Sequence, residues 1–135
     1  MASTQASPRT VFYWLASLAT AALFAIPGSA LLARVPHFAT EMMRLGFPGY
    51  FLPPFGALKI AAAAIILLPG LPRLKEWAYA GIAFDAGFAA YSRAAIGDPP
   101  LQVLLPLAIG SLAIVSWALR PASRTLQPVT ASRST

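Results

Sequence analysis

The sequence contains no cysteine, a single histidine and very little charge. Without cysteine the chain cannot form disulfides, iron–sulfur clusters or a thiol nucleophile. His37 cannot build a metal site alone, and we predict no metal ligands and no catalytic residues. No serine lies in a nucleophile motif, and no glycine-rich phosphate loop is present. The sequence therefore predicts no independent catalytic activity.

Only 10% of the 135 residues are charged and 58% are hydrophobic, whereas a soluble domain usually has about a quarter of its residues charged. The apolar residues form runs that approach the roughly 20 residues needed to cross a bilayer. The net charge is +6, but the basic residues lie between and beside these runs, where they orient a membrane protein. We therefore predict an all-α, polytopic membrane protein with the lipid bilayer as partner and no nucleic-acid partner.

The runs predict a four-helix transmembrane bundle that forms one membrane domain over residues 11–120. The predicted spans are residues 11–33, 50 or 54 to 68, 77–96 and 101–119. Residues 1–10 form a polar N-terminal tail, and residues 121–135 form a Ser/Thr-rich tail that we predict to be disordered. The loops are too short to fold separately, so a single domain is expected.

The first span contains a break. Pro27-Gly28 is expected to kink the helix or end it early, because proline removes a backbone hydrogen bond. Gly28-Ser29-Ala30 also resembles a signal-peptide cleavage site. The apolar run is long and only Arg9 precedes it, which favours an uncleaved span, with cleavage as the alternative.

The longest loop covers residues 34–53. Val35, Phe38, Met42 and Leu45 recur at helical spacing. This pattern predicts a short amphipathic helix over residues 35–45 that lies on the periplasmic membrane surface. The following Gly-Phe-Pro-Gly sequence predicts a turn.

Lysine and arginine predict the orientation of the four spans. The N-terminal tail, the 69–76 turn and the C-terminal tail share one side and carry Arg9, Arg73, Lys75, Arg120, Arg124 and Arg133. The opposite side carries Arg34, Arg44 and Arg93. The positive-inside rule then places both termini in the cytoplasm. Within the 69–76 turn, we expect Lys75 and Glu76 to form a solvated pair.

Two charged residues lie inside predicted spans. Lys59 precedes Pro69 by ten residues and Asp85 follows Glu76 by nine, so both lie roughly 14–15 Å from the same turn. An unpaired charge at this depth costs roughly 2.5–3.5 kcal/mol, which predicts an ion pair. The pair could fix helix register or form a functional polar site.

Arg93 lies two helical turns beyond Asp85, near the same face. It could extend its side chain to the outer membrane interface. Alternatively, it could help to bind an anionic or carbonyl-bearing ligand. Lys59, Asp85 and Arg93 are thus the candidate ligand-binding residues.

Several short motifs together are typical of a known family. The most specific is Leu74-Lys75-Glu76-Trp77-Ala78-Tyr79-Ala80-Gly81. Weaker ones are Tyr13-Trp14, Leu45-Gly46-Phe47-Pro48, Phe55-Gly56 with Lys59, Leu68-Pro69, Phe84-Asp85 and Gly97-Asp98. On these motifs the chain resembles the DoxX-like family of small bacterial membrane proteins. The resemblance implies a four-helix bundle in the bacterial inner membrane. The wider group is named for subunits of a thiosulfate:quinone oxidoreductase, which suggests a redox partner or a quinone site.

Three functions follow as hypotheses. The chain could be an accessory or structural subunit linked to quinone, redox or envelope-stress systems, partnered by another membrane or redox subunit or by a second copy. A quinone would take hydrogen bonds from Lys59 and Arg93 and stack on Trp77 or Phe88. The alternatives are a small-solute or proton-coupled carrier that uses Asp85 and Lys59, and a membrane anchor without ligand.

Overall fold

The protein is all-helical, as the sequence predicts. The computed structural model describes residues 5–126, and no strand occurs in that range. The α-helices are α1 (Pro8–Leu32), α2 (Pro36–Arg44), α3 (Leu52–Leu67), α4 (Pro72–Ala95) and α5 (Pro100–Ala118). Two short 3₁₀ helices, η1 (Gly49–Phe51) and η2 (Ala122–Arg124), precede α3 and follow α5.

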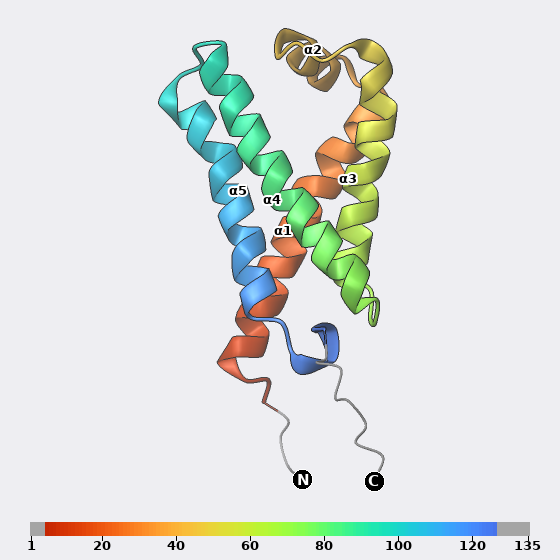
Figure 1. Cartoon of the computed structure of the whole chain (residues 1–135), viewed down its shortest axis with the longest axis vertical. Coiled ribbons are helices and arrows are strands. Elements are labelled where there is room, and N and C mark those ends of the chain that lie inside the picture. The colour runs from red at the N-terminus through yellow and green to blue at the C-terminus, as the bar shows by residue number, and fades with distance from the viewer. Residues whose placement is uncertain (1–4, 127–135) are drawn as a thin grey trace, which may run out of the picture.

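The long helices run alternately up and down (Figure 1). One end of the molecule holds the start of α1, the α3–α4 turn and the end of α5, and we name it the terminal end. The other holds α2 and the α4–α5 turn, and we name it the α2 end. Helix α1 packs on α3 and α5, while α4 packs on α5 and α3. The α1/α3 pair and the α4/α5 pair diverge toward the α2 end (Figure 1).

Prolines set the starts of the helices, and this corrects two predicted boundaries. Helix α1 begins at Pro8, where the Ser7 hydroxyl accepts a hydrogen bond from the Thr10 amide at 3.3 Å. Helix α4 begins at Pro72. The predicted span starts at residues 11 and 77 were too late, because proline is favoured at the first helical position. The predicted early end at Pro27 was also wrong, since α1 continues to Leu32.

The amphipathic segment after α1 is helical, as predicted. Helix α2 covers Pro36–Arg44 and ends before Gly46, which adopts a positive φ of 96°. That backbone conformation favours glycine and turns the chain toward η1. The membrane surface on which this helix lies remains a prediction from the sequence.

Three helical segments in the described part of the chain are long and apolar enough to cross a membrane. They are α1, the continuous η1–α3 segment (Gly49–Leu67) and α5. Helix α4 has 24 residues, which is enough length for a bilayer. It also carries five charged residues: Arg73, Lys75, Glu76, Asp85 and Arg93. The chain is therefore a multi-pass membrane protein, in which α4 has the length of a span but not the apolar composition.

Glycines bring the helices of each pair into close contact. A Cβ atom on Gly56 in α3 would lie 2.4 Å from the carbonyl oxygen of Gly28 in α1. A Cβ atom on Gly110 in α5 would lie 2.8 Å from that of Ala86 in α4. Small residues at such crossings let two backbones approach closely in a membrane. The α1/α3 and α4/α5 pairs are thus each tightly packed.

Two cations satisfy the carbonyl groups at the end of α3. Pro69 has no N–H to donate to the Ile65 carbonyl, and the last carbonyls of any helix lack helical partners. Lys75 Nζ donates to the Ile65 and Leu68 carbonyls. Arg124 Nη1 donates to the carbonyls of residues 66, 67 and 68 at 3.1–3.2 Å. The end of α3 is therefore held by side chains from α4 and from the segment after α5.

The predicted solvated pair of Lys75 and Glu76 was wrong. Lys75 is 0% exposed, because it is drawn to the free carbonyls of α3. Glu76 instead accepts hydrogen bonds from Arg120 at 2.6 Å and from the Trp117 indole at 2.9 Å. These contacts tie the start of α4 to the end of α5.

Residues 121–126, which we assigned to the polar tail, include the 3₁₀ helix η2, and Arg124 packs against the terminal end. The remainder of the predicted disordered tail, with Arg133, lies outside the described residues. Of the predicted tail over residues 1–10, residues 1–4 lie outside the described residues, residues 5–7 precede α1 and residues 8–10 belong to it.

A chain of hydroxyl groups joins the two helix pairs at the terminal end. The Ser17 hydroxyl in α1 and the Ser116 hydroxyl in α5 lie 2.7 Å apart and are hydrogen-bonded. The Tyr79 hydroxyl in α4 is 2.6 Å from the same Ser116 oxygen. All three side chains are buried. This end of the molecule is closed by buried polar contacts.

Candidate functional site

The two charges predicted inside spans form an ion pair. Lys59 Nζ of α3 donates a hydrogen bond to Asp85 Oδ2 of α4 at 2.7 Å. The side chains are only 14% and 19% exposed. The prediction of an ion pair from matched depth is therefore confirmed, and its functional role is a separate question.

Aromatic rings surround the ammonium group of this pair. Lys59 Nζ lies 4.4 Å from the centre of the Phe24 ring and 4.7 Å from that of Phe55. Ring faces attract cations, and this attraction is strongest where water is excluded. The ion pair and the two rings together lower the free-energy cost of placing these charges in apolar surroundings.

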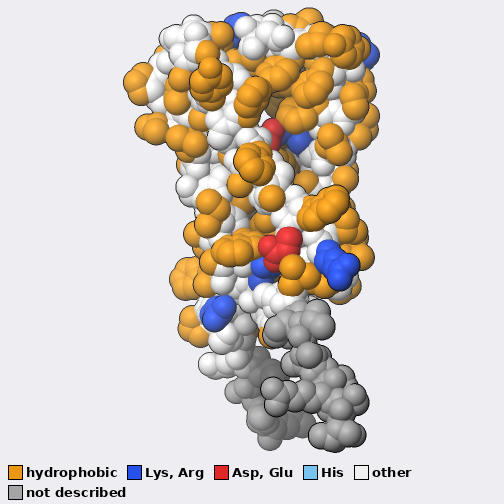
Figure 2. Space-filling model, in the orientation of Figure 1, with side chains coloured by type: hydrophobic (Ala, Val, Ile, Leu, Met, Phe, Trp, Pro, Cys, Tyr) orange, Lys and Arg blue, Asp and Glu red, His pale blue; other side chains and the backbone are white. Residues whose placement is uncertain are grey.

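The pair lies in a groove between the two helix pairs. The groove has a volume of about 570 Å³ and is lined by residues from α1, α2, η1, α3, α4 and α5. Figure 2 shows the hollow among apolar side chains, with acidic and basic atoms visible inside it. Pro27 of α1 and Pro106 of α5 both lie in its wall. A volume of this size matches pockets that bind small organic molecules.

Phenylalanine dominates the groove lining. Seven of the eight phenylalanines in the chain line it. They are Phe24, Phe38, Phe47, Phe51, Phe55, Phe84 and Phe88. The eighth, Phe12, is 61% exposed near the start of α1. The concentration of rings in one place makes the groove suited to a flat, apolar ligand.

Three of these rings form a stacked series that leads to Lys59. The Phe47 and Phe51 rings are stacked with centres 5.2 Å apart, and the Phe51 and Phe55 rings with centres 5.0 Å apart. Phe55 then contacts the Lys59 ammonium. Phe51, Phe55 and Lys59 are spaced four apart in the sequence, which places them on one face of the η1–α3 segment. Phe47 extends the series from the loop before η1. An aromatic surface thus runs from the α2 end to the ion pair.

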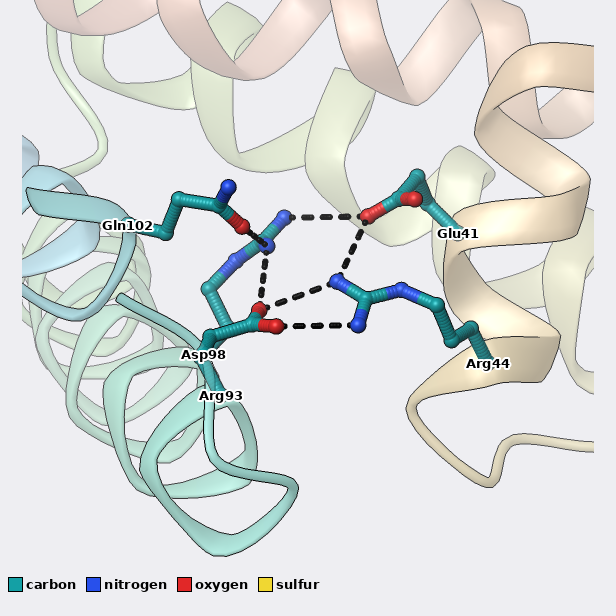
Figure 3. Close-up of polar contacts among 5 residues, drawn as sticks. All are labelled: Glu41, Arg44, Arg93, Asp98 and Gln102. Atoms are coloured by element: carbon teal, nitrogen blue, oxygen red, sulfur yellow. Dashed lines mark hydrogen bonds and ion pairs between the residues drawn. The ribbon is translucent and has the colours of Figure 1, made fainter. Parts of the chain in front are cut away.

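A second set of charges lies at the α2 end (Figure 3), and two of its members, Glu41 and Arg93, also line the groove. We name Glu41, Arg44, Arg93, Asp98 and Gln102 the mouth cluster. Arg44 of α2 donates to both carboxylate oxygens of Asp98 at 2.9 and 3.0 Å. Arg93 of α4 donates to Asp98 at 2.9 Å and to Gln102 at 3.0 Å. Glu41 Oε2 lies 3.3 Å from Arg44 and 3.6 Å from Arg93.

The mouth cluster stabilises the ionised form of Asp98. Hydrogen bonds from the Arg44 guanidinium, and then from that of Arg93, hold the pKa of Asp98 below its usual range. The pKa of Arg44 is correspondingly raised, first by its hydrogen bonds to Asp98. Both groups therefore stay charged at neutral pH, and the contacts between α2 and the α4–α5 turn are ionic.

The structure separates the predicted ligand-contacting residues into two groups. Lys59, Asp85, Arg93 and Phe88 all line the groove. The guanidinium of Arg93, however, is already engaged by the mouth cluster. Trp77 is 78% exposed at the terminal end and does not line the groove. Of the predicted polar contacts, Lys59 and Asp85 are the ones placed deep in the groove.

Sequence reasoning missed the aromatic series and the mouth cluster. The spacing of Phe51 and Phe55 before Lys59 was a readable signal, because these residues follow one helical face. The pairing of Arg44 with Asp98 had no such signal, since 54 residues separate them. It arises only when α2 is placed beside the α4–α5 turn.

The lining of the groove supplies hydrogen-bond donors and acceptors and carries no net charge. A Lys59 ammonium has three N–H donors, and one of them is used by Asp85. Asp85 supplies acceptor oxygens at the same depth. The charged lining residues are two cations and two carboxylates, Lys59, Arg93, Glu41 and Asp85, so their formal charges cancel.

Neither a curated protein nor a solved structure matches this chain. A family model, that of the DoxX-like family, matches residues 15–116. This range contains every residue that lines the groove. Because the match covers most of the 135 residues, the chain belongs to the DoxX-like family.

Proposed function

We propose that α1, α3, α4 and α5 all cross the bacterial inner membrane as a four-helix bundle, with the terminal end in the cytoplasm. The charges of α4 support this proposal. Arg73, Lys75 and Glu76 belong to its first two turns and Arg93 to its last, which leaves Asp85 as the one charge midway. Asp85 is paired with Lys59, which lowers the cost of burying either charge in lipid.

The side chains at the terminal end support the cytoplasmic assignment. Arg9, Arg73, Lys75, Arg120 and Arg124 lie there with a single carboxylate, that of Glu76, among the described residues. At the α2 end, three arginines face two carboxylates, those of Glu41 and Asp98, so the basic excess is smaller there than at the terminal end. The three tryptophans, Trp14, Trp77 and Trp117, all belong to the terminal end as well. Basic and tryptophan side chains gather at membrane interfaces, and the basic excess marks the cytoplasmic one.

In a protein with these spans and this orientation, the groove binds a quinone-class molecule. Such a molecule has a flat ring with carbonyl oxygens and an apolar tail. The observation that carries this function is an aromatic groove with an ion pair deep inside it. The stacked Phe47–Phe51–Phe55 series provides a ring-binding wall, and Lys59 provides donors for a carbonyl oxygen. A bound quinone accepts and releases electrons together with protons.

The chain contributes binding rather than electron transfer. With no cysteine and one histidine, it is suited to hold the quinone for a second membrane or redox subunit. The closed terminal end favours this role over that of a carrier. The buried Ser17–Ser116–Tyr79 contacts and the Glu76–Arg120 pair obstruct a path through that end.

The proposal is tested by mass spectrometry of quinones and lipids that remain with the purified protein. Phe55→Ala removes a ring from the groove wall, and Phe12→Ala removes the one phenylalanine outside it as a matched control. We expect quinone to co-purify with the parent and with Phe12→Ala, and to be lost from Phe55→Ala. Equal quinone in all three proteins, or none in the parent, would contradict the function. Solute uptake in proteoliposomes would instead support the carrier.

A further inference from the structure

The mouth cluster is the structural link between α2 and the α4/α5 pair. Its bonds run from Glu41 and Arg44 on α2 to Arg93 and Asp98 (Figure 3). Helix α2 contains no fully buried residue. Its apolar side chains therefore anchor it less firmly than the buried cores of the longer helices anchor those helices. In the ionic link, Arg44 is 42% exposed and Asp98 is 7% exposed, so water and salt reach the link from the Arg44 side.

Helix α2 also has a backbone bend at each end. Arg34, just before α2, has a positive φ of 56°, and Gly46, just after it, has a positive φ of 96°. Nothing lies within 4 Å of the position that a Cβ atom on Gly46 would occupy. The two ends of α2 are therefore turning points with free space around at least one of them.

The apolar face of α2 covers the groove. Phe38 and Met42 from α2, and Leu45 directly after it, line the groove together with Glu41. Displacing α2 would expose both the aromatic wall and the route to Lys59 and Asp85. The α1/α3 and α4/α5 pairs, by contrast, are fixed by the close glycine contacts at Gly56 and Gly110. Movement at this end is consequently easiest for α2.

We propose that α2 is a hinged cover, latched by the Arg44–Asp98 and Glu41–Arg93 pairs, which controls access from the aqueous phase to the Lys59–Asp85 pair. Opening the latch admits water and the polar part of a ligand. Closing it seals the groove and leaves the ligand in contact with the aromatic wall. The identity of the ligand rests on the proposed function, whereas the movement of α2 does not.

The absence of cysteine from the chain makes the movement directly measurable. Thr40→Cys on α2 and Leu101→Cys on α5 carry spin labels, and pulsed electron paramagnetic resonance gives the distance distribution in lipid nanodiscs. Arg44→Gln breaks the latch. Arg73→Gln is the control, because it removes the same charge from an exposed side chain at the terminal end, and Arg73 makes no ion pair with any described residue. We expect a longer and broader distance distribution in Arg44→Gln, and an unchanged one in Arg73→Gln.

A second measurement reports access rather than distance. Ala89 lines the groove, and a cysteine at this position reacts with a water-soluble maleimide. We expect Arg44→Gln to raise the labelling rate by up to about fivefold, as loss of a surface ion pair permits, and Arg73→Gln to leave the rate unchanged. Unchanged distances together with unchanged rates in Arg44→Gln would overturn the cover. If the parent protein binds no quinone but Arg44→Gln still changes the distances and the labelling rates, the proposed function is overturned and the cover is not.

Discussion

The two ends of this molecule are held together by different kinds of contact. At the terminal end, Lys75 is fully buried against α3 carbonyls and the Ser116 hydroxyl lies between those of Ser17 and Tyr79. At the α2 end, the helix pairs diverge, and the link to α2 depends on Arg44, whose side chain is 42% exposed. One end is held by buried polar contacts, and the other by an ion-pair cluster in which Arg44 is exposed although Asp98 is only 7% exposed.

This difference shows how a small bundle can combine stability with an open groove. Buried hydrogen bonds are costly to break because their groups would be left unsatisfied. Surface ion pairs exchange readily with water. The protein therefore fixes its helices at the terminal end and leaves room between them at the other. The Lys59–Asp85 pair lies where the packed region meets the groove.

The largest effect is expected at that boundary. Lys59→Leu leaves the Asp85 carboxylate without its cation and should lower the free energy of unfolding by about 3–5 kcal/mol. Lys59→Leu combined with Asp85→Leu should cost less than the sum of the two single changes, because no charge is then left alone. Unfolding in mixed micelles of increasing sodium dodecyl sulfate measures both. A single variant as stable as the parent would show that the pair is open to water.

The ends can be compared directly with one change at each. Lys75→Met keeps the length of the side chain but removes the donor to the Ile65 and Leu68 carbonyls, and it should lower the free energy of unfolding by about 3 kcal/mol. Arg44→Gln at the α2 end should produce no measurable change in the same assay. Similar losses in the two variants would remove the distinction between the ends.

Glycine substitutions test the tight helix pairs on which the groove depends. Gly56→Ala places a Cβ atom 2.4 Å from the Gly28 carbonyl oxygen, and such overpacking should cost about 1–3 kcal/mol. Gly87→Ala is the control, since nothing lies within 4 Å of its Cβ position. Thermal unfolding in detergent should distinguish them. If Gly56→Ala were as stable as the parent in this assay, α1 and α3 would be able to move apart at no cost in free energy.

The smallest effect concerns pH. The pKa of Asp98 is lowered in the folded protein, first by the hydrogen bonds from Arg44. The contribution of ionised Asp98 to the stability of the latch is therefore complete above the ordinary aspartate pKa of about 3.9. It is lost as the pH falls through the lowered pKa of the folded protein. The spin-label distance between Thr40→Cys and Leu101→Cys should stay constant from about pH 8 to pH 5 and lengthen only below about pH 4. Lengthening near pH 6 would require another titrating group at the latch.

Sequence reasoning predicted the helices and the ion pair because both depend on local or short-range rules. Lys59 and Asp85 are only 26 residues apart, and one tight turn fixes their relative depth. The start of α4 was misjudged because the charges of Lys75 and Glu76 suggested a longer turn. Pro72 and the free carbonyls of α3 override that signal by drawing these residues into the helix.

The rest of the site could not be predicted because it depends on how helices far apart in the sequence meet. Phe24 and Phe55 contact the same ammonium group from α1 and α3, which required the Gly28–Gly56 crossing to be known. The Arg44–Asp98 contact required the position of α2 over the groove. The sequence contains these residues, but their partners are set by tertiary packing.

The most direct test of the account is a titration of a short-chain quinone into the protein in nanodiscs, with the ion pair present and removed. Lys59→Leu combined with Asp85→Leu keeps the groove neutral and removes its deep hydrogen-bonding groups, while Phe12→Leu serves as the control. The account predicts at least about tenfold weaker binding to the double variant, which corresponds to about 1.4 kcal/mol, and unchanged binding to the control. Equal affinity in all three proteins would contradict a ligand site built around Lys59 and Asp85.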